Sequence, residues 1–97
     1  MEVRFAATVT SAPRYFTGPH GRHEAFDVRR DDGSAVEVVD NVDIAPPCPV
    51  AVGDRIAIKG ELVRDDRNGG SLVHWTHHDP AHVHAGGYLV LGGVRYS

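Results

Sequence analysis

The sequence predicts an all-β protein, specifically a small five-stranded Greek-key barrel of the OB type with an extra C-terminal β-hairpin. Apolar and polar residues alternate in several short segments, which is the period of a strand with one buried face. Turn-forming clusters separate these segments, and none of the segments carries the apolar stripe of an amphipathic helix. The 97 residues suffice for one hydrophobic core, so we expect a single OB-like domain over residues 1–97.

Alternation and one hairpin turn predict the first three strands. Residues 3–9 place four apolar side chains on one face, whereas residues 11–22 contain two prolines and two glycines and are predicted to be a loop. The second strand, 23–30, and the third, 35–39, flank an Asp-Gly turn and must therefore be antiparallel. The core-facing residues of these strands are expected to be Val3, Phe5, Ala7, Val9, Phe26, Val28, Val36 and Val38.

The next segment, 40–52, is predicted to be an irregular connection because its three prolines interrupt regular structure, leaving one helical turn at 41–45. Such a connection after the third strand, in place of a hairpin, is typical of an OB-type barrel. A strand then reaches Leu62 with Ile56 and Ile58 facing inward, and Gly60 within it indicates a bend or bulge.

Two further hairpins complete the predicted barrel. Residues 65–70 form a hairpin loop that leads to a strand at 71–76, in which Val73 and Trp75 face the core. On this alternation His74 and Thr76 face outward. Residues 88–96 are predicted to form the terminal hairpin on a Gly-Gly turn.

The composition limits the classes of partner that the protein is expected to bind. Ten Lys and Arg against thirteen Asp and Glu give a net charge of -3, which argues against a protein held to nucleic acid mainly by phosphate neutralisation. The single cysteine, Cys48, excludes an intramolecular disulfide. The sequence shows neither a signal-peptide pattern at its start nor an apolar run near the ~20 residues of a membrane span, so we expect a cytoplasmic protein without a membrane partner. The oligomeric state is left open.

Several segments together resemble one family. They are Gly21-Arg22-His23-Glu24-Ala25-Phe26, Asn41-Val42-Asp43-Ile44-Ala45-Pro46, Val52-Gly53-Asp54-Arg55-Ile56, Gly60-Glu61, His74-Trp75-Thr76-His77-His78-Asp79-Pro80, Gly87-Tyr88 and Tyr96. This set resembles the bacterial DUF-3465 family over most of the chain, and the string at 74–80 is its most specific part. The resemblance implies an OB-fold-like barrel. It indicates nothing about activity, because that family is functionally uncharacterised. Asp40 departs from the family pattern, which often has His there.

The histidine-rich run from residue 74 to 84 is the most unusual chemical feature. A metal site of His74, His77, His78 and Asp79 would hold a divalent cation such as zinc, because imidazole and carboxylate are its common ligands. Without a metal, a catalytic set of His23, His74, His77 and His78 would supply a base and an acid for a phosphate ester. The alternative is a polar, turn-forming loop whose histidines face water.

A second candidate set is suited to binding. Ligand-binding residues on an OB-type barrel lie on the second and third strands and nearby loops, and the candidates here are Tyr15, Phe16, Arg29, Trp75 and Thr76. Aromatic rings stack on bases and cations attract phosphates. The alternatives are loop packing for Tyr15 and Phe16, a core position for Trp75, and solvated cations on the outer strand faces.

Two functions of different classes follow. The first is a non-catalytic binding module for single-stranded nucleic acid or a small anionic ligand next to the histidine-rich site. The second is a small histidine-dependent hydrolase, phosphodiesterase-like, with or without a divalent metal; whether the protein is an enzyme is left open. Both require that barrel alternation brings His23 to the same side of the molecule as residues 74–79.

Overall fold

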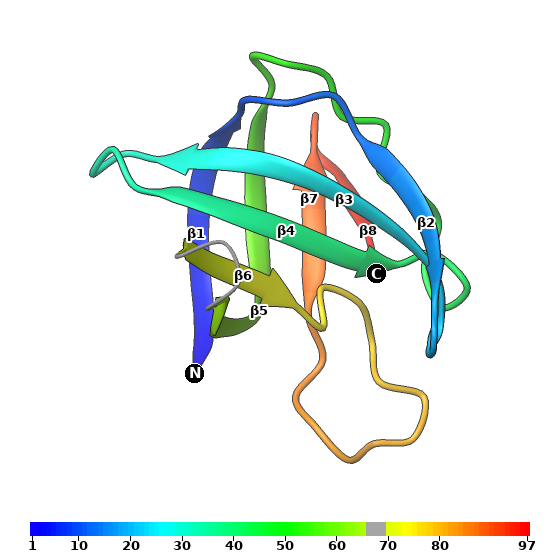
Figure 1. Ribbon diagram of the computed structural model, residues 1–97. Coiled ribbons are helices and arrows are strands. Elements are labelled where there is room, and N and C mark those ends of the chain that lie inside the picture. Colours follow the sequence, from blue (N-terminus) through cyan, green and yellow to red (C-terminus); the bar gives the residue numbers. More distant parts are fainter. Residues whose placement is uncertain (66–69) are drawn as a thin grey trace.

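The computed structural model describes residues 1–65 and 70–97, and this part of the chain forms eight strands without a helix (Figure 1). The strands are β1 (Glu2–Val9), β2 (Arg14–Gly18), β3 (Gly21–Arg30), β4 (Ala35–Asn41), β5 (Arg55–Asp65), β6 (Gly70–His74), β7 (Tyr88–Leu91) and β8 (Val94–Tyr96). The described residues accordingly include no helix able to cross a membrane. The tip of the predicted hairpin loop at 65–70 lies outside the described residues.

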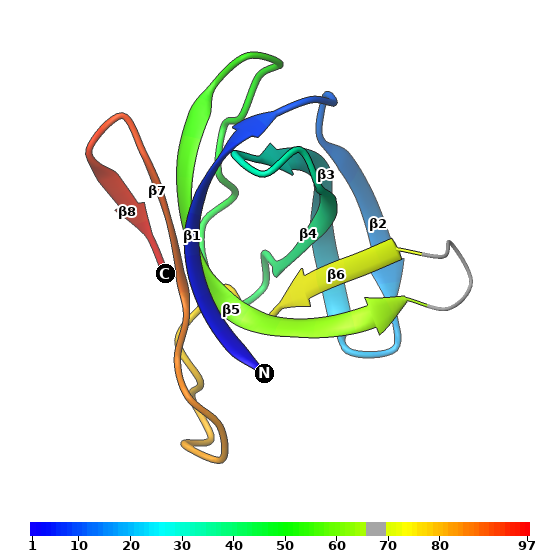
Figure 2. The same ribbon diagram turned by 90° about the vertical axis from the view of Figure 1, so that its left-hand side faces the viewer.

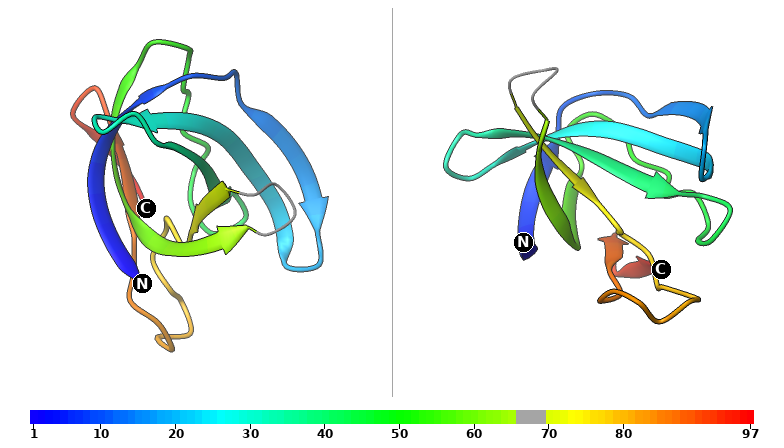
Figure 3. Two further views of the ribbon diagram at one scale, coloured as in Figure 1. Left: turned by 60° about the vertical axis from the view of Figure 1, so that its left-hand side comes forward. Right: turned by 60° about the horizontal axis from the view of Figure 1, so that its bottom comes forward.

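Five of the strands close into a ring. β1 pairs with both β3 and β5, and the order β1-β3-β4-β6-β5 returns to β1 (Figures 2 and 3). Only the β4–β6 pair is parallel within this ring. β2 pairs with β3, and the β7–β8 hairpin pairs with β5, outside the ring. The predicted closed five-stranded barrel with an extra C-terminal hairpin is therefore confirmed.

The loop predicted for residues 11–22 was wrong over part of its length. Residues 14–18 form β2, which makes an antiparallel hairpin with β3 and places Phe16 directly opposite His23. Tyr15, Phe16 and Thr17 all favour extended backbone. Pro13, Gly18, Pro19 and Gly21, which suggested a loop, flank this short strand or form its turn. Neighbouring β3 supplies the ladder that a short strand needs.

The alternation predicted for residues 71–76 also fails at its end. β6 stops at His74, and Trp75 adopts a φ of 56°, a left-handed conformation that side chains with a Cβ rarely take. This turn reverses the pattern: Trp75 is 37% exposed, whereas Thr76 is completely buried. Trp75 is thus outside the core, and Thr76 does not face the solvent.

Apolar side chains from all five ring strands fill the barrel. The buried core includes Ala7, Val9, Phe26, Val28, Val36, Val38, Ile56, Ile58 and Val73, with Cys48, Val50 and Leu89 packed against them. Two carboxylates share this interior, because Glu24 continues the inward face of β3 and Asp40 continues that of β4. The two residues are direct cross-strand partners.

The bend expected at Gly60 has a steric basis. Around this residue β5 changes neighbours, since residues 56–59 pair with β7 and residues 61–65 pair with β6. A Cβ on Gly60 would lie 2.6 Å from the carbonyl oxygen of His74 and 2.7 Å from Cγ1 of Val73. The absence of a side chain therefore lets β5 cross closely over the end of β6.

Candidate functional site

A pocket of about 260 Å³ lies beside the outer face of β3 and β4, against the segment 75–87. Its lining is dominated by imidazoles, with apolar side chains, an amide and one carboxylate between them. The lining residues are His20, His23, Val39, Asn41, Ile44, His74, Trp75, His77, Asp79, Pro80 and His84. Three parts of the chain that are distant in sequence therefore meet at one concave site.

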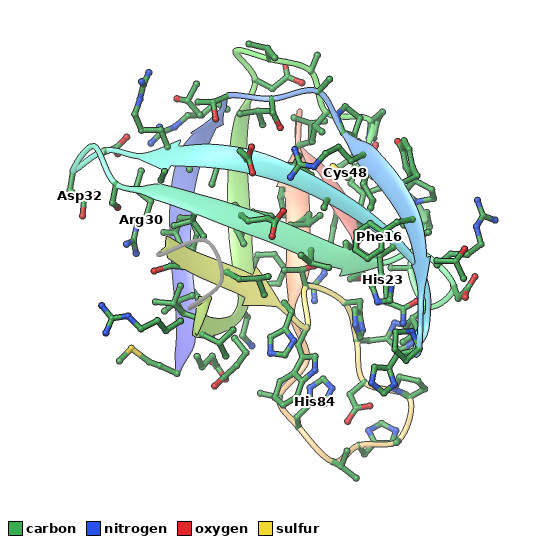
Figure 4. All side chains as sticks on the ribbon, in the orientation of Figure 1. Phe16, His23, Arg30, Asp32, Cys48 and His84 are labelled. Atoms are coloured by element: carbon green, nitrogen blue, oxygen red, sulfur yellow. The ribbon has the colours of Figure 1, made fainter. Side chains whose placement is uncertain are left out.

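The barrel topology explains this convergence. His23 lies on the outer face of β3, opposite Asn41 of β4. Since β4 and β6 are parallel neighbours, they end at the same rim of the barrel, and His74 closes β6 there. The 75–87 segment thus begins beside His23, as both functional hypotheses require. Figure 4 shows Phe16 and His23 on the side of the barrel from which the loop carrying His84 extends.

Asp79 organises the 75–87 segment. Its Oδ2 accepts hydrogen bonds from the backbone N–H groups of Val83 (2.6 Å) and His84 (2.9 Å), and its Oδ1 accepts one from Ala81 (3.1 Å). These donors, the His84 N–H above all, lower the pKa of Asp79. Both carboxylate oxygens of this candidate metal ligand are therefore engaged with backbone.

We expect Asp79→Asn to loosen the segment locally. An amide replaces one acceptor oxygen with an N–H donor that opposes the backbone donors. The amides of Val83 and His84 should then exchange with solvent about tenfold faster, in line with one lost hydrogen bond. Hydrogen exchange followed by NMR measures this effect. The control is Asp43→Asn, because Asp43 accepts from the Arg22 N–H and should leave both amides unchanged; equal rates in the two variants would contradict the assigned role.

The imidazoles differ in which nitrogen is free. His77 Nδ1 lies 2.6 Å from the carbonyl oxygen of His78, and His84 Nδ1 lies 2.8 Å from that of Ala85. A carbonyl only accepts, so both Nδ1 atoms carry a hydrogen, and in the neutral form of each ring the lone pair is on Nε2. Burial lowers the pKa of His74 and of His77, so these two rings are uncharged at neutral pH.

Trp75 is enclosed by two of these rings. His74 stacks on one side with ring centroids 4.7 Å apart, and His84 stacks with centroids 3.8 Å apart and planes inclined by 10°. Phe16 stacks in the same way on His23, at 5.2 Å. A nucleobase could reach a face of Trp75 only by displacing an imidazole. The indole therefore supports the pocket wall in this structure.

Several predicted site residues lie elsewhere. His78 is exposed and does not line the pocket. Tyr15 and Phe16 alternate on β2, and the Tyr15 hydroxyl donates to Glu24 Oε2, so the two rings do not form one stacking surface. Arg29 is six residues from His23 along β3, roughly 20 Å at the rise of a strand. The buried Thr76 bonds within the protein and not to the pocket opening.

Sequence reasoning missed His20 and did not select Asn41 or His84. His84 stood inside the dense histidine run, so its composition offered a signal. His20 lies in the turn between β2 and β3, and it became visible as a site residue only with that hairpin. Asn41 is held by its own bonds, because its Nδ2 donates to the carbonyl of His20 at 3.0 Å.

The described residues give no support to the predicted metal site, and acidic side chains accompany two of the cations on the outer strand faces. Among the described residues, no three His, Cys, Asp or Glu side chains are grouped so that they could hold a metal ion. A zinc site at His74, His77, His78 and Asp79 therefore stays a prediction from the sequence. Arg55 makes two bonds of 2.8 Å to Asp31, and Lys59 lies 3.8 Å from Glu2, so acids accompany these two outer-face cations.

The fold and the site define a small closed β-barrel protein with a histidine-lined pocket on its outer face. A family model described as "Protein of unknown function (DUF3465)" matches residues 16–97, which is most of the chain. The chain belongs to this family. No curated protein matches it.

Proposed function

We propose that this protein is a non-catalytic OB-type binding module that takes a small anionic ligand in the histidine-lined pocket. The observation that carries the proposal is the convergence of five histidines, from the β2–β3 hairpin and from residues 74–84, on one pocket. The ring order β1-β3-β4-β6-β5, with a parallel β4–β6 pair, agrees with an OB-type barrel. The pocket lies beside β3 and β4, the second and third strands of that ring, where OB-type domains bind ligands.

The size of the pocket favours a small ligand over a nucleic-acid strand. Pockets for drug-sized molecules span roughly 300–1,000 Å³, and this one measures about 260 Å³. A strand also needs a continuous track of cations for its phosphates. Arg55, Lys59 and Arg14 instead lie against acidic side chains. The Nδ1 atom of His23 is buried without a hydrogen-bond partner among the described residues, so its N–H can donate to a compact oxyanion such as phosphate.

The test uses inorganic phosphate and the fluorescence of Trp75, the single tryptophan of the chain. Phosphate should produce a saturable change in the wild type, and His23→Gln should weaken binding about tenfold through loss of one hydrogen bond to a charged group. His23 is chosen because it approaches the pocket from the hairpin side and does not stack on the indole. His82→Gln is the control, since His82 is exposed and outside the lining.

Two outcomes would replace this proposal. Salt-sensitive binding of a single-stranded oligonucleotide, weakened by Phe16→Ala and unaffected by phosphate, would indicate a nucleic-acid module. Absence of any response to phosphate in the wild type would remove the small-anion assignment.

A hydrolase is the second candidate, and one observation favours it. The Nδ1–H of His77 is fixed on a backbone carbonyl, which leaves Nε2 as a base, and the His84 ring lies edge-on with its centroid 6.3 Å away. Turnover of a phosphodiester such as bis(4-nitrophenyl) phosphate, lost in His77→Gln with the fold intact, would support this candidate over the binding module.

A further inference from the structure

Two carboxylates face each other inside the barrel. Glu24 and Asp40 are direct partners across β3 and β4, and neither has any solvent exposure. Side chains at directly opposed positions have Cβ atoms about 5 Å apart. Two carboxylates at such separation in a buried site cannot both hold a negative charge cheaply. One of them is therefore expected to carry a proton.

The hydrogen-bond donors decide which one. Glu24 Oε1 accepts the backbone N–H of Cys48 at 2.9 Å, and Oε2 accepts the Tyr15 hydroxyl at 3.0 Å. For Asp40, Oδ2 has no hydrogen-bond partner in the described part of the chain. Oδ1 contacts the hydroxyl of Thr76, and the backbone N–H of Asn41 is a further, weaker donor to this carboxyl. Donors stabilise the charged form, so the negative charge belongs on Glu24 and the proton on Asp40.

The position of Thr76 agrees with this assignment. Its Oγ1 lies 3.1 Å from the carbonyl oxygen of Val39 and 3.1 Å from Oδ1 of Asp40. A hydroxyl has one hydrogen to donate, and the carbonyl of Val39 can only accept. Both contacts are satisfied when Thr76 donates to Val39 and a protonated Asp40 donates to Thr76 Oγ1.

We infer that Asp40 is the carboxyl of this pair that holds a proton, up to near-neutral pH, and that it acts as a positioning residue for the histidine-lined pocket through its hydrogen bond to Thr76. Thr76 stands between Trp75 and His77, both of which line the pocket. Anchoring Thr76 in the barrel fixes where these two side chains emerge. The inference rests on the proposed function only in calling the pocket a binding site.

The surrounding charges support the same state. Burial raises the pKa of Asp40 to about 7 and the charge of Glu24 adds to the rise, while the contacts with the Thr76 hydroxyl and the Asn41 backbone N–H limit it. Glu24 on β3 and Cys48, in the connection after β4, are the titratable neighbours in this interior. Burial raises the pKa of the Cys48 thiol to about 12, so Cys48 adds no charge there near neutrality.

The direct test is the 13Cγ chemical shift of Asp40 in the wild-type protein between pH 4 and 9, assigned by its loss in Asp40→Asn. We expect a titration midpoint near 7, against about 4 for an ordinary Asp. A midpoint at or below 5 would overturn the inference. The midpoint is measured in the wild-type protein without a ligand, and the variant serves only to assign the signal.

The coupling to the pocket is tested by Trp75 fluorescence over the same range. A transition near pH 7 should appear in the wild type and in Thr76→Ser, which keeps the hydroxyl, and should vanish in Asp40→Asn and in Thr76→Val. A transition that persists in Asp40→Asn would overturn the positioning role. His74 and His77 titrate at lower pH, and Asp40→Asn retains both.

The two proposals fail separately. If Asp40 titrates near 7 and controls the Trp75 transition while phosphate does not bind, the assigned ligand is wrong and the positioning role is supported. If phosphate binds while Asp40 titrates near 4, the positioning role falls and the binding module stands.

Discussion

Asp40→Asn is expected to stabilise the protein at pH 8 by about 2 kcal/mol. The folded-state pKa of Asp40 is about 7, whereas an unfolded Asp has a pKa of about 3.9. Because the folded state binds the proton more tightly, the wild type loses stability as pH rises from about 4 to about 7, by at most about 4 kcal/mol. The Asn amide still donates to Thr76 and never ionises, so the variant avoids this loss. Its extra buried N–H costs about 1–3 kcal/mol, and the difference is the expected net gain.

Urea unfolding at pH 4 and at pH 8 measures this effect. Asn should have no advantage at pH 4, where Asp40 is protonated in the folded state and about half protonated in the unfolded state, and its advantage should appear by pH 8. Glu2→Gln, on an exposed residue of β1, is the control and should show no such pH-dependent gain. Equal destabilisation by Asp40→Asn at both pH values would mean that Asp40 is ionised in the folded protein.

Gly87→Ala is expected to destabilise the protein by about 3 kcal/mol. A Cβ on Gly87 would overlap with the carbonyl oxygens of Trp75 and Lys59 and would lie 3.1 Å from Cα of Thr76. All three are backbone atoms, so no side chain can move aside. The Gly87 N–H also donates to the carbonyl of His77 at 2.8 Å, which closes the pocket segment onto itself.

Gly86→Ala is the matched control for this substitution. A Cβ there would lie 3.6 Å from Cα of His78, an ordinary contact, and the change should stay within about 0.5 kcal/mol. Urea unfolding of both variants gives the comparison. Similar stabilities for the two would show that the segment 75–87 relaxes freely around residue 87, contrary to the close packing described above.

Much of the fold was predictable because alternation is a direct consequence of strand geometry. Residues 3–9 and 35–39 alternate cleanly, and the Asp-Gly turn at 32–33 joins the strands that it was predicted to join. β2 was missed because its three strand-forming residues are enclosed by prolines and glycines, and only the ladder with β3 stabilises them. Pairing partners of this kind lie outside any local pattern.

The candidate site was predictable only in part, for a related reason. The convergence of His23 with the histidine run follows from barrel alternation. Trp75 lies outside and Thr76 inside, the reverse of the prediction, because Trp75 adopts a left-handed φ. No residue type in this segment indicated such a conformation. Asp40 was not recognised as an interior residue because β4 runs two residues beyond its predicted end. In this extension the alternation continues, so Asp40 faces inward like Val38.

Because Cys48 is buried, the rate at which its thiol reacts reports how often the barrel opens. This thiol has no solvent exposure and lies in the core cluster, and its pKa of about 12 leaves almost no thiolate at neutral pH. Alkylating reagents therefore reach the sulfur only in molecules whose barrel has come apart locally or globally. The labelling rate of a single natural atom thus reports how often the interior meets water, with no dye or engineered residue.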